Sequence, residues 1–230
     1  MNQLNVTQAR TGLIVKQNAL VRQVYAWMGL GLAITAMLAM VTVSSPGMLQ
    51  AIVGNRPVFY GLMIGELALV FILSGAINRL SGTVATLLFL GYSALNGLTL
   101  SVIFIVYTAD SIASTFAVTA AMFGAMSIYG YLTKKDLTSW GSFLFMGLIG
   151  IVIASLVNIF LQSSAVSWVV SGIGVLVFTG LTAYDTWKIK AMAAAGEEGR
   201  KPAILGALTL YLDFINLFLM LLRFMGGRRD

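Results

Sequence analysis

Seven long apolar stretches constrain the fold of this chain more than any other feature. They cover residues 24–43, 58–77, 84–107, 112–132, 143–161, 166–186 and 203–224. A hydrocarbon core of about 30 Å is crossed by roughly 20 apolar residues in a helix, so each stretch is long enough to span a membrane once. The stretches are continuously apolar rather than apolar at every second residue, which argues against the strands of a transmembrane barrel. The sequence therefore predicts an all-α membrane protein with seven transmembrane helices.

The polar residues are too few to cover a water-soluble fold of this length. Only 10% of the residues are charged, whereas an ordinary soluble domain carries about 25%. The first twenty residues are polar and basic without a compact apolar core, so we expect no cleavable signal peptide. We predict an N-terminal cytoplasmic tail over 1–23, one transmembrane domain over 24–224 and a short basic tail over 225–230.

The basic residues predict the orientation in the membrane. Ten Lys and Arg residues fall on the side of the N-terminus and four on the opposite side. An excess of Lys and Arg marks the cytoplasmic side, so the N-terminus is expected in the cytoplasm. The basic C-terminus conflicts with seven full crossings, and a last segment that re-enters the membrane is an alternative. The net charge of +6 is read as a topology signal and a contact with anionic lipid, not as nucleic-acid binding.

The chain contains neither Cys nor His, which excludes several classes of chemistry. Without Cys there is no disulfide, no thiolate metal ligand and no cysteine nucleophile. Without His there is no Ser-His dyad for an intramembrane serine protease. Every Lys falls in a predicted loop or tail, so a buried Schiff-base lysine for retinal is missing. We therefore expect no cofactor and no enzymatic activity.

Three carboxylates fall within the apolar stretches: Glu66, Asp185 and Asp213. An ionisable side chain in a membrane span is costly and marks a functional site by default. Asp213 is the deepest, at about 15 Å from the start of its span. For Asp185 the simpler explanation is a surface pairing with Lys188, one helical turn away. Glu66 fits a hydrogen-bonding role in helix packing equally well.

A meeting of Asp185 with Asp213 would create a pH-sensitive site. Two carboxylates in a low dielectric cannot both stay ionised, so we expect the protonation of the pair to respond to pH near neutrality. The pair meets only if the seventh helix begins deeper than its apolar run indicates, or if water enters from the cytoplasm. Arg79 lies at the same predicted depth as Asp185, and an ion pair between them is expected to close a cytoplasmic mouth.

Other polar side chains accompany these groups at helical spacing. Thr209, Asp213 and Asn216 share one face of the last span, because residues three and four apart lie on the same side of a helix. Such a stripe is expected to face protein or water. The supporting polar residues that we select are Thr209 and Asn216, Thr182 and Tyr184 beside Asp185, and Asn96 in the third span. For Asn96 the expected role is an interhelical hydrogen bond.

Three segments resemble the Bax inhibitor family, also called the transmembrane Bax-inhibitor-motif family, in its bacterial branch. They are YSALNGLTLS at 92–101, GLTAYDT at 180–186 and ALTLYLDFINLFLMLLR at 207–223, and the resemblance runs from about residue 25 to the C-terminus. It implies a bacterial inner-membrane protein in which six helices wrap a central, C-terminal seventh. The eukaryotic members suppress cell death, and that role is not carried over to this chain.

The same resemblance implies a function and assigns residues to it. It implies a pH-sensitive calcium leak governed by a pair of Asp residues on the last two helices, which correspond to Asp185 and Asp213. An Arg on the second helix, here Arg79, bonds one of them to close the path. Glu66 occupies roughly the place of an acidic residue found in the second helix of some members.

The leading hypothesis is therefore a passive, pH-sensitive leak for calcium. Transient calcium is expected at Asp185 and Asp213, since a tight site needs six to eight oxygens and passage demands weaker binding. The expected partners are the lipid bilayer, calcium, protons and other membrane proteins. A non-transporting regulator, for instance of a membrane protease, is the first alternative. An intramembrane aspartyl protease is the second; Tyr184-Asp185 fits it, but the residues before Asp213 are not the Gly-x-Gly of those enzymes.

Overall fold

The computed structural model describes residues 3–229 and the side chains of 18–229. In that part of the chain seven helices are long and apolar enough to cross a membrane, as predicted. The spans are Asn18–Ser44 within α1 (Gln3–Ser44), Arg56–Arg79 formed by α3 (Arg56–Ala76) and the 3-10 helix η1 (Ile77–Arg79), Gly82–Val106 formed by α4 (Gly82–Leu100) and α5 (Ile103–Val106), α6 (Ala109–Leu132), α7 (Thr138–Leu161), α8 (Ser164–Ala194) and α9 (Arg200–Met225). The short α2 (Pro46–Ile52) follows the first span.

Polar N-cap residues mark the starts of three of the helices. The side chains of Asn55, Ser81 and Thr108 each accept a hydrogen bond from a backbone N–H three residues later, at 3.2 to 3.4 Å. A side-chain oxygen in this position satisfies one of the N–H groups that the first turn leaves unpaired. Of the two predicted tails, residues 1–2 and 230 lie outside the described residues, and the chain is helical from Gln3.

The last two helices extend beyond the apolar runs that announce them. The predicted span ended at 186, but α8 continues to Ala194, and α9 begins at Arg200 rather than at 203. Gly196 and Gly199 lie in the turn between them with φ of +90° and +95°. Only glycine adopts such angles without strain, so this turn depends on both residues.

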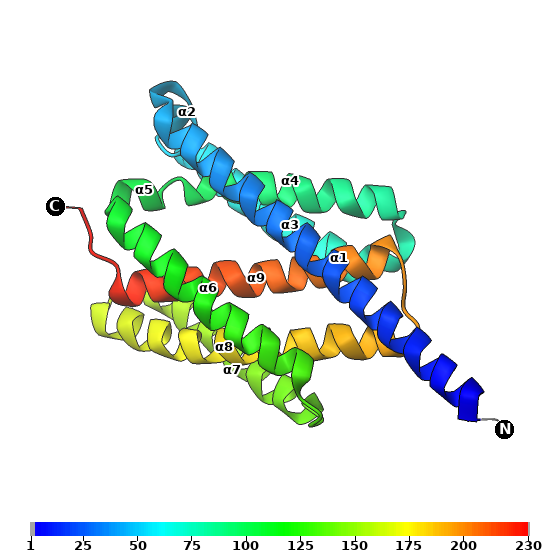
Figure 1. Cartoon of the computed structure of the whole chain (residues 1–230). Helices are drawn as coiled ribbons and strands as arrows, with labels where there is room; N and C mark the ends of the chain where they lie inside the picture. Colours follow the sequence, from blue (N-terminus) through cyan, green and yellow to red (C-terminus); the bar gives the residue numbers. More distant parts are fainter. Residues whose placement is uncertain (1–2, 230) are drawn as a thin grey trace. The chain divides into compact units, whose positions relative to one another are not determined.

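The chain divides into two compact units. The first contains the chain up to Ile105 together with Ile189–Tyr211, and the second contains Val106–Lys188 together with the segment from Leu212 onward. In the first unit α4 lies beside both α1 and α3, and the elements can be followed in chain order in Figure 1. The second unit holds α6, α7, most of α8 and the last part of α9.

Small residues bring the helices of each unit close together. In the first unit, a Cβ added at Gly97 of α4 would lie 2.6 Å from the carbonyl oxygen of Thr35 in α1. In the second unit, a Cβ at Gly130 of α6 would collide with the carbonyl oxygen of Ala183 in α8. Glycine at such points lets helix backbones approach within lipid, where packing rather than hydrophobic exclusion holds helices together.

The helices differ in how much of their apolar surface is covered. In the most apolar window of α9, 72% of the residues are buried, whereas the corresponding figure for the second span is 6%. The most exposed large side chains of α3 are apolar, among them Phe71 and Ile64. In a membrane such faces are solvated by lipid, so their exposure is what a spanning helix requires.

Candidate functional site

Two buried carboxyl groups meet in the second unit. Asp185 on α8 is 8% exposed, Asp213 on α9 is 4% exposed, and their carboxyl groups share a hydrogen bond. Oδ2 of Asp213 is buried and receives no hydrogen bond from any group of the described chain. An ionised carboxylate only accepts hydrogen bonds, so a bond between two carboxyl groups requires a proton on one of them.

The extended helices explain why the two Asp residues meet. Asp213 follows the first residue of α9, Arg200, by thirteen residues, which is about 20 Å of helix. Asp185 precedes the end of α8 at Ala194 by nine residues, or about 14 Å. Both carboxylates thus lie well inside their helices, and the mismatch in depth expected from the apolar runs falls to about 6 Å.

Several side chains surround Asp185 on α8. Thr182 is buried and donates its hydroxyl proton to the carbonyl oxygen of Phe178 at 2.8 Å. The Tyr184 ring packs against Gly141 of α7, where a Cβ would collide with it. Lys188 is exposed, its Nζ lies 6.0 Å from the centroid of the Tyr184 ring, and its charge acts on the Asp185 carboxyl group. The positive charge of the exposed Lys188 therefore acts on the carboxyl pair.

The predicted polar stripe of α9 is present, but the side chains on either side of Asp213 form hydrogen bonds with the backbone of their own helix. Thr209 donates to the carbonyl oxygen of Leu205 at 3.1 Å, and the Asn216 amide donates to that of Leu212 at 2.8 Å. Both bonds return to the helix's own backbone, a local pattern that Ser, Thr and Asn often adopt within helices. Neither side chain is hydrogen-bonded to Asp213, so within the described residues the direct polar partner of Asp213 is Asp185.

Glu66 belongs to a different polar cluster, in the first unit. Its carboxylate accepts hydrogen bonds from Oγ1 of Thr99 at 2.7 Å and from Nδ2 of Asn96 at 3.3 Å. Oδ1 of Asn96 accepts from the hydroxyl of Tyr211 at 3.1 Å, and that hydroxyl lies 2.6 Å from Oγ1 of Thr35. The cluster therefore joins α1, α3, α4 and the first part of α9.

Sequence reasoning found Asn96 and missed the two residues that complete this cluster. Tyr211 and Thr35 are buried, and each falls in an apolar run. A tyrosine among leucines looks like a core residue, so its hydroxyl gives no signal until the fold places a partner beside it. The sequence gives only a general indication for Tyr211, because a buried Tyr hydroxyl usually has a hydrogen-bond partner.

Arg79 is exposed and ends η1, at the end of the second span. It belongs to the first unit, whereas Asp185 belongs to the second. Its predicted ion pair with Asp185 therefore stays a prediction. Nearby, Nζ of Lys201 donates to the carbonyl oxygen of Asn78 at 3.2 Å, which ties the start of α9 to η1.

The described residues contain no group of three or more His, Cys, Asp or Glu side chains that would hold a metal ion. A firmly bound calcium ion takes six to eight oxygens. Two carboxyl groups supply at most four, so the donor set of the Asp pair suits passing contact with a cation.

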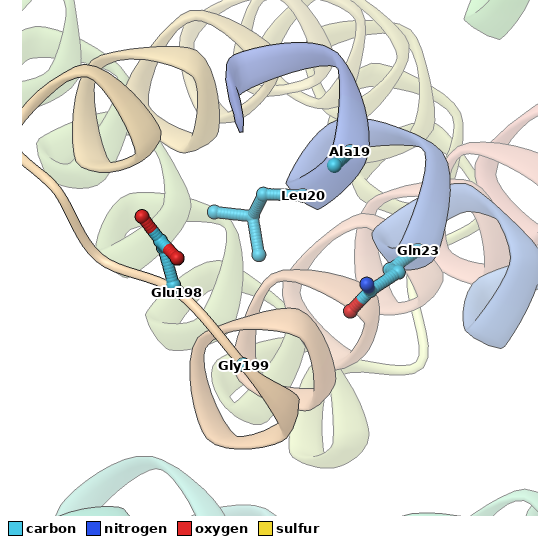
Figure 2. Close-up of a pocket in the computed structure, with 5 residues that line it drawn as sticks. All are labelled: Ala19, Leu20, Gln23, Glu198 and Gly199. Atoms are coloured by element: carbon cyan, nitrogen blue, oxygen red, sulfur yellow. The ribbon is translucent and has the colours of Figure 1, made fainter. Parts of the chain in front are cut away.

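A small pocket in the first unit lies apart from all of these groups. It has a volume of about 110 Å³ and is lined by Ala19, Leu20, Gln23, Glu198 and Gly199. Figure 2 shows the Leu20 side chain between those of Glu198 and Gln23. None of the predicted site residues lines it.

Comparison with known proteins identifies the family. Residues 17–230 match the family model described as "Inhibitor of apoptosis-promoting Bax1". The chain belongs to the Bax inhibitor family. This confirms the resemblance carried by the three segments around residues 92–101, 180–186 and 207–223. The description of the family names no enzymatic activity.

Bax inhibitor family relatives cover the chain along almost its whole length. Inner membrane protein YbhL of Escherichia coli strain K12 is 56% identical over 230 residues, which cover 98% of this chain and 97% of YbhL. A protein of Borreliella burgdorferi is 45% identical over 99% of both chains, and a membrane protein of Streptococcus pyogenes serotype M6 is 42% identical over 97% of both. With seven apolar helices, this Bax inhibitor family member is a multi-pass protein of the inner membrane.

Proposed function

We propose that this protein is a passive, pH-sensitive leak for cations, with calcium as the main substrate, gated by the Asp185–Asp213 pair. The observation that carries the proposal is the hydrogen bond between two buried carboxyl groups. With one proton between them, the pair carries a single negative charge in a low dielectric. That negative charge attracts a cation to the pair. Protonation of the second carboxyl group removes the charge and changes the electrostatic potential that a cation meets along the path.

In the proposed closed state, the negative charge of the pair is neutralised by the Arg79 guanidinium. An ion pair between a guanidinium and a carboxylate is among the stronger charge-assisted contacts, and its geometry favours two parallel hydrogen bonds. A second proton on the pair removes the carboxylate that Arg79 needs, and calcium competes for the same oxygens. Acid and calcium therefore act in the same direction, and the leak increases as the pH falls.

The Glu66 cluster is part of the proposed ion path. Its carboxylate, the Asn96 amide and the Tyr211 hydroxyl present oxygens of the kind that a hard cation prefers. We also propose that the other six helices surround α9 and that the N-terminus is cytoplasmic. The burial of 72% of the most apolar window of α9 supports the central position of this helix.

The test measures calcium entry into liposomes that contain the purified protein and a calcium dye, over a range of pH. For the wild type we expect flux that rises as the pH falls. Asp213→Asn and Asp185→Asn are expected to abolish the pH dependence, because an amide cannot hold the shared proton. Arg79→Ala is expected to raise the flux at neutral pH, because the closing ion pair is lost.

Asp136→Asn is the matched control. It makes the same chemical change at an exposed carboxylate between α6 and α7, where Oδ1 accepts hydrogen bonds from the backbone N–H and the hydroxyl of Thr138, as the Oδ1 of Asn can also do. Its flux and pH dependence should equal those of the wild type. Flux that is absent in every sample, or identical in all variants, would contradict the leak. Peptide cleavage that either Asp substitution abolishes would instead favour an aspartyl protease.

A further inference from the structure

We propose that the cation path continues beyond the Asp pair along a row of buried hydroxyl groups on α6, and that a cluster of Phe rings closes it. The row consists of Thr115, Thr119 and Ser127, with Phe123 in the position between the last two. It lies entirely in the second unit. The proposal rests on the leak function proposed for the Asp pair, but it concerns other residues and predicts an observable that does not require calcium flux.

The row follows every fourth position of α6, so its members lie on one ridge of the helix. Their exposed fractions are 1% for Thr115, 0% for Thr119, 6% for Phe123 and 7% for Ser127. Other positions of this helix carry exposed, apolar side chains, such as Val118 within the row and Ile128 directly after it. The hydroxyl groups are thus concentrated on the covered side of the helix, while the apolar side chains face outward.

Two of these hydroxyls lack the partner that such groups normally have. In the described residues, Oγ1 of Thr115 and Oγ of Ser127 are buried and make no hydrogen bond, as is also true of Oδ2 of Asp213. Thr119 follows the usual pattern and donates to the carbonyl oxygen of Thr115 at 2.7 Å. A buried polar atom without a partner costs free energy, which is repaid where a water molecule or a hydrated ion passes.

Two contacts place Ser127 at the level of the Asp pair. One turn before Ser127, the Phe123 ring meets the Phe214 ring at 5.4 Å between centroids, and Phe214 directly follows Asp213. Three residues after Ser127, Gly130 packs against the carbonyl of Ala183, two residues before Asp185. Ser127 lies between these contacts, so its hydroxyl extends the polar site of the two Asp residues onto α6.

The Phe rings separate this site from the other hydroxyls. The buried ring of Phe123 meets the buried Phe214 edge to face, whereas Phe116, which meets Phe214 and also Phe218 at 6.2 Å, is 47% exposed and lies at the outer edge of this cluster. These rings occupy the stretch of α6 between Ser127 and Thr115. A constriction of apolar side chains excludes water and blocks ions without any charged gate. The path would therefore have two barriers, the Asp pair and this aromatic cluster.

Cysteine accessibility tests the row directly, because the natural chain contains no Cys. Single substitutions Thr115→Cys, Thr119→Cys and Ser127→Cys would be treated in liposomes with a positively charged, membrane-impermeant methanethiosulfonate, added to either side. Val118→Cys and Ile128→Cys on the exposed face of the same helix are the controls. Only a thiolate reacts, and thiolates form in water rather than in lipid, so we expect labelling at least about tenfold faster in the row than in the controls.

The two parts of the row should also differ in the side from which they react. Ser127→Cys should be labelled from the side of the Asp pair, and Thr115→Cys and Thr119→Cys from the opposite side. Phe123→Ala should make Ser127→Cys reactive from both sides, and it should raise any calcium flux severalfold. Phe160→Ala removes a ring that is 88% exposed on α7 and should change neither property. Should Phe123→Ala fail to fold, judged by size-exclusion elution, Phe123→Leu makes the same test with a smaller change.

The possible results separate the two proposals. Row cysteines that react no faster than Val118→Cys and Ile128→Cys would overturn the hydroxyl path, whatever the calcium flux shows. A fast, sided reaction without calcium flux would support the path and contradict calcium as its substrate. Labelling of Ser127→Cys from both sides in the wild-type background would overturn the aromatic barrier.

Discussion

The hydroxyl of Tyr211 is the most sharply defined target for a stability measurement. The side chain is fully buried, and its oxygen bonds with Oγ1 of Thr35 at 2.6 Å and with Oδ1 of Asn96 at 3.1 Å. Tyr211→Phe removes this one oxygen. The ring stays in place, edge to face with Phe89 and Tyr92 at 5.9 and 5.6 Å between centroids. The change therefore tests the hydrogen bonds with little change in packing.

The expected cost follows from what each partner loses. A net hydrogen bond contributes about 0.5–1.5 kcal/mol, and interhelical bonds in membrane proteins average about 0.6 kcal/mol. The single hydroxyl proton of Thr35 still has an acceptor, since the carbonyl oxygens of Ser93 and Gly31 lie at 2.8 and 3.0 Å from Oγ1. Oδ1 of Asn96 loses the donor that Tyr211 supplies, and an unsatisfied buried acceptor costs about 1–3 kcal/mol. We expect Tyr211→Phe to lower the free energy of unfolding by about 2 kcal/mol.

The assay is reversible unfolding in mixed micelles, with the denaturing detergent increased stepwise and helicity followed by circular dichroism. Tyr92→Phe is the matched control, because it removes the same atom from a neighbouring buried ring that is not one of the hydrogen-bonded members of the Glu66 cluster. We expect it to change stability by less than about 0.5 kcal/mol. Equal stabilities of the two variants would refute the role given to the Tyr211 hydroxyl.

Two further predictions concern the second unit. Gly130→Ala should destabilise the protein by about 1–3 kcal/mol, because the added methyl group collides with the Ala183 carbonyl. Gly124→Ala in the same helix is the control and should not destabilise it, because there is open space around Gly124. Equal thermal midpoints of the two variants would contradict this prediction. Hydrogen bonds from the side chain and backbone of Thr138 lower the pKa of Asp136. Its contribution to stability is therefore present above the ordinary carboxyl pKa and lost as the pH falls through the lower folded value, and an NMR titration at or above the ordinary value would contradict it.

The seven spans were predictable because the hydrophobicity of a segment is also the property that places it in a lipid bilayer. A continuous apolar run of about 20 residues has few alternatives in a bilayer, and local capping residues such as Ser81 and Thr108 mark where helices begin. Hydropathy does not report helix that continues into the polar region. Residues 187–194 carry two Lys residues and still extend α8, and this extension gives Asp185 its depth.

The polar clusters were predictable only in part, because a hydrogen bond between distant residues leaves no local trace. The acidic residues stood out, since a charge within an apolar run is rare. The partners of Glu66 were predictable in part, because Asn96 and Thr99 are polar residues three positions apart and so share a helix face. Tyr211 and Thr35 are 176 residues apart, and only the packing of α1 against α4 brings the Thr35 side chain into the cluster.

The two polar clusters differ in a way that bears on function. In the first unit, Glu66, Asn96, Thr99, Tyr211 and Thr35 satisfy one another through a continuous set of hydrogen bonds. In the second unit, the unpartnered atoms are Oδ2 of Asp213 and the hydroxyls of Ser127 and Thr115; in the first unit the Thr42 hydroxyl, which lies outside the Glu66 cluster, is unpartnered as well. In lipid an unpaired polar group is expensive, so a satisfied cluster stabilises a fold, whereas an unsatisfied one is retained where it serves a passing ion or proton. This contrast predicts that substitutions in the Glu66 cluster lower stability as well as permeation, whereas substitutions at the unpartnered atoms of the second unit change permeation with little loss of stability.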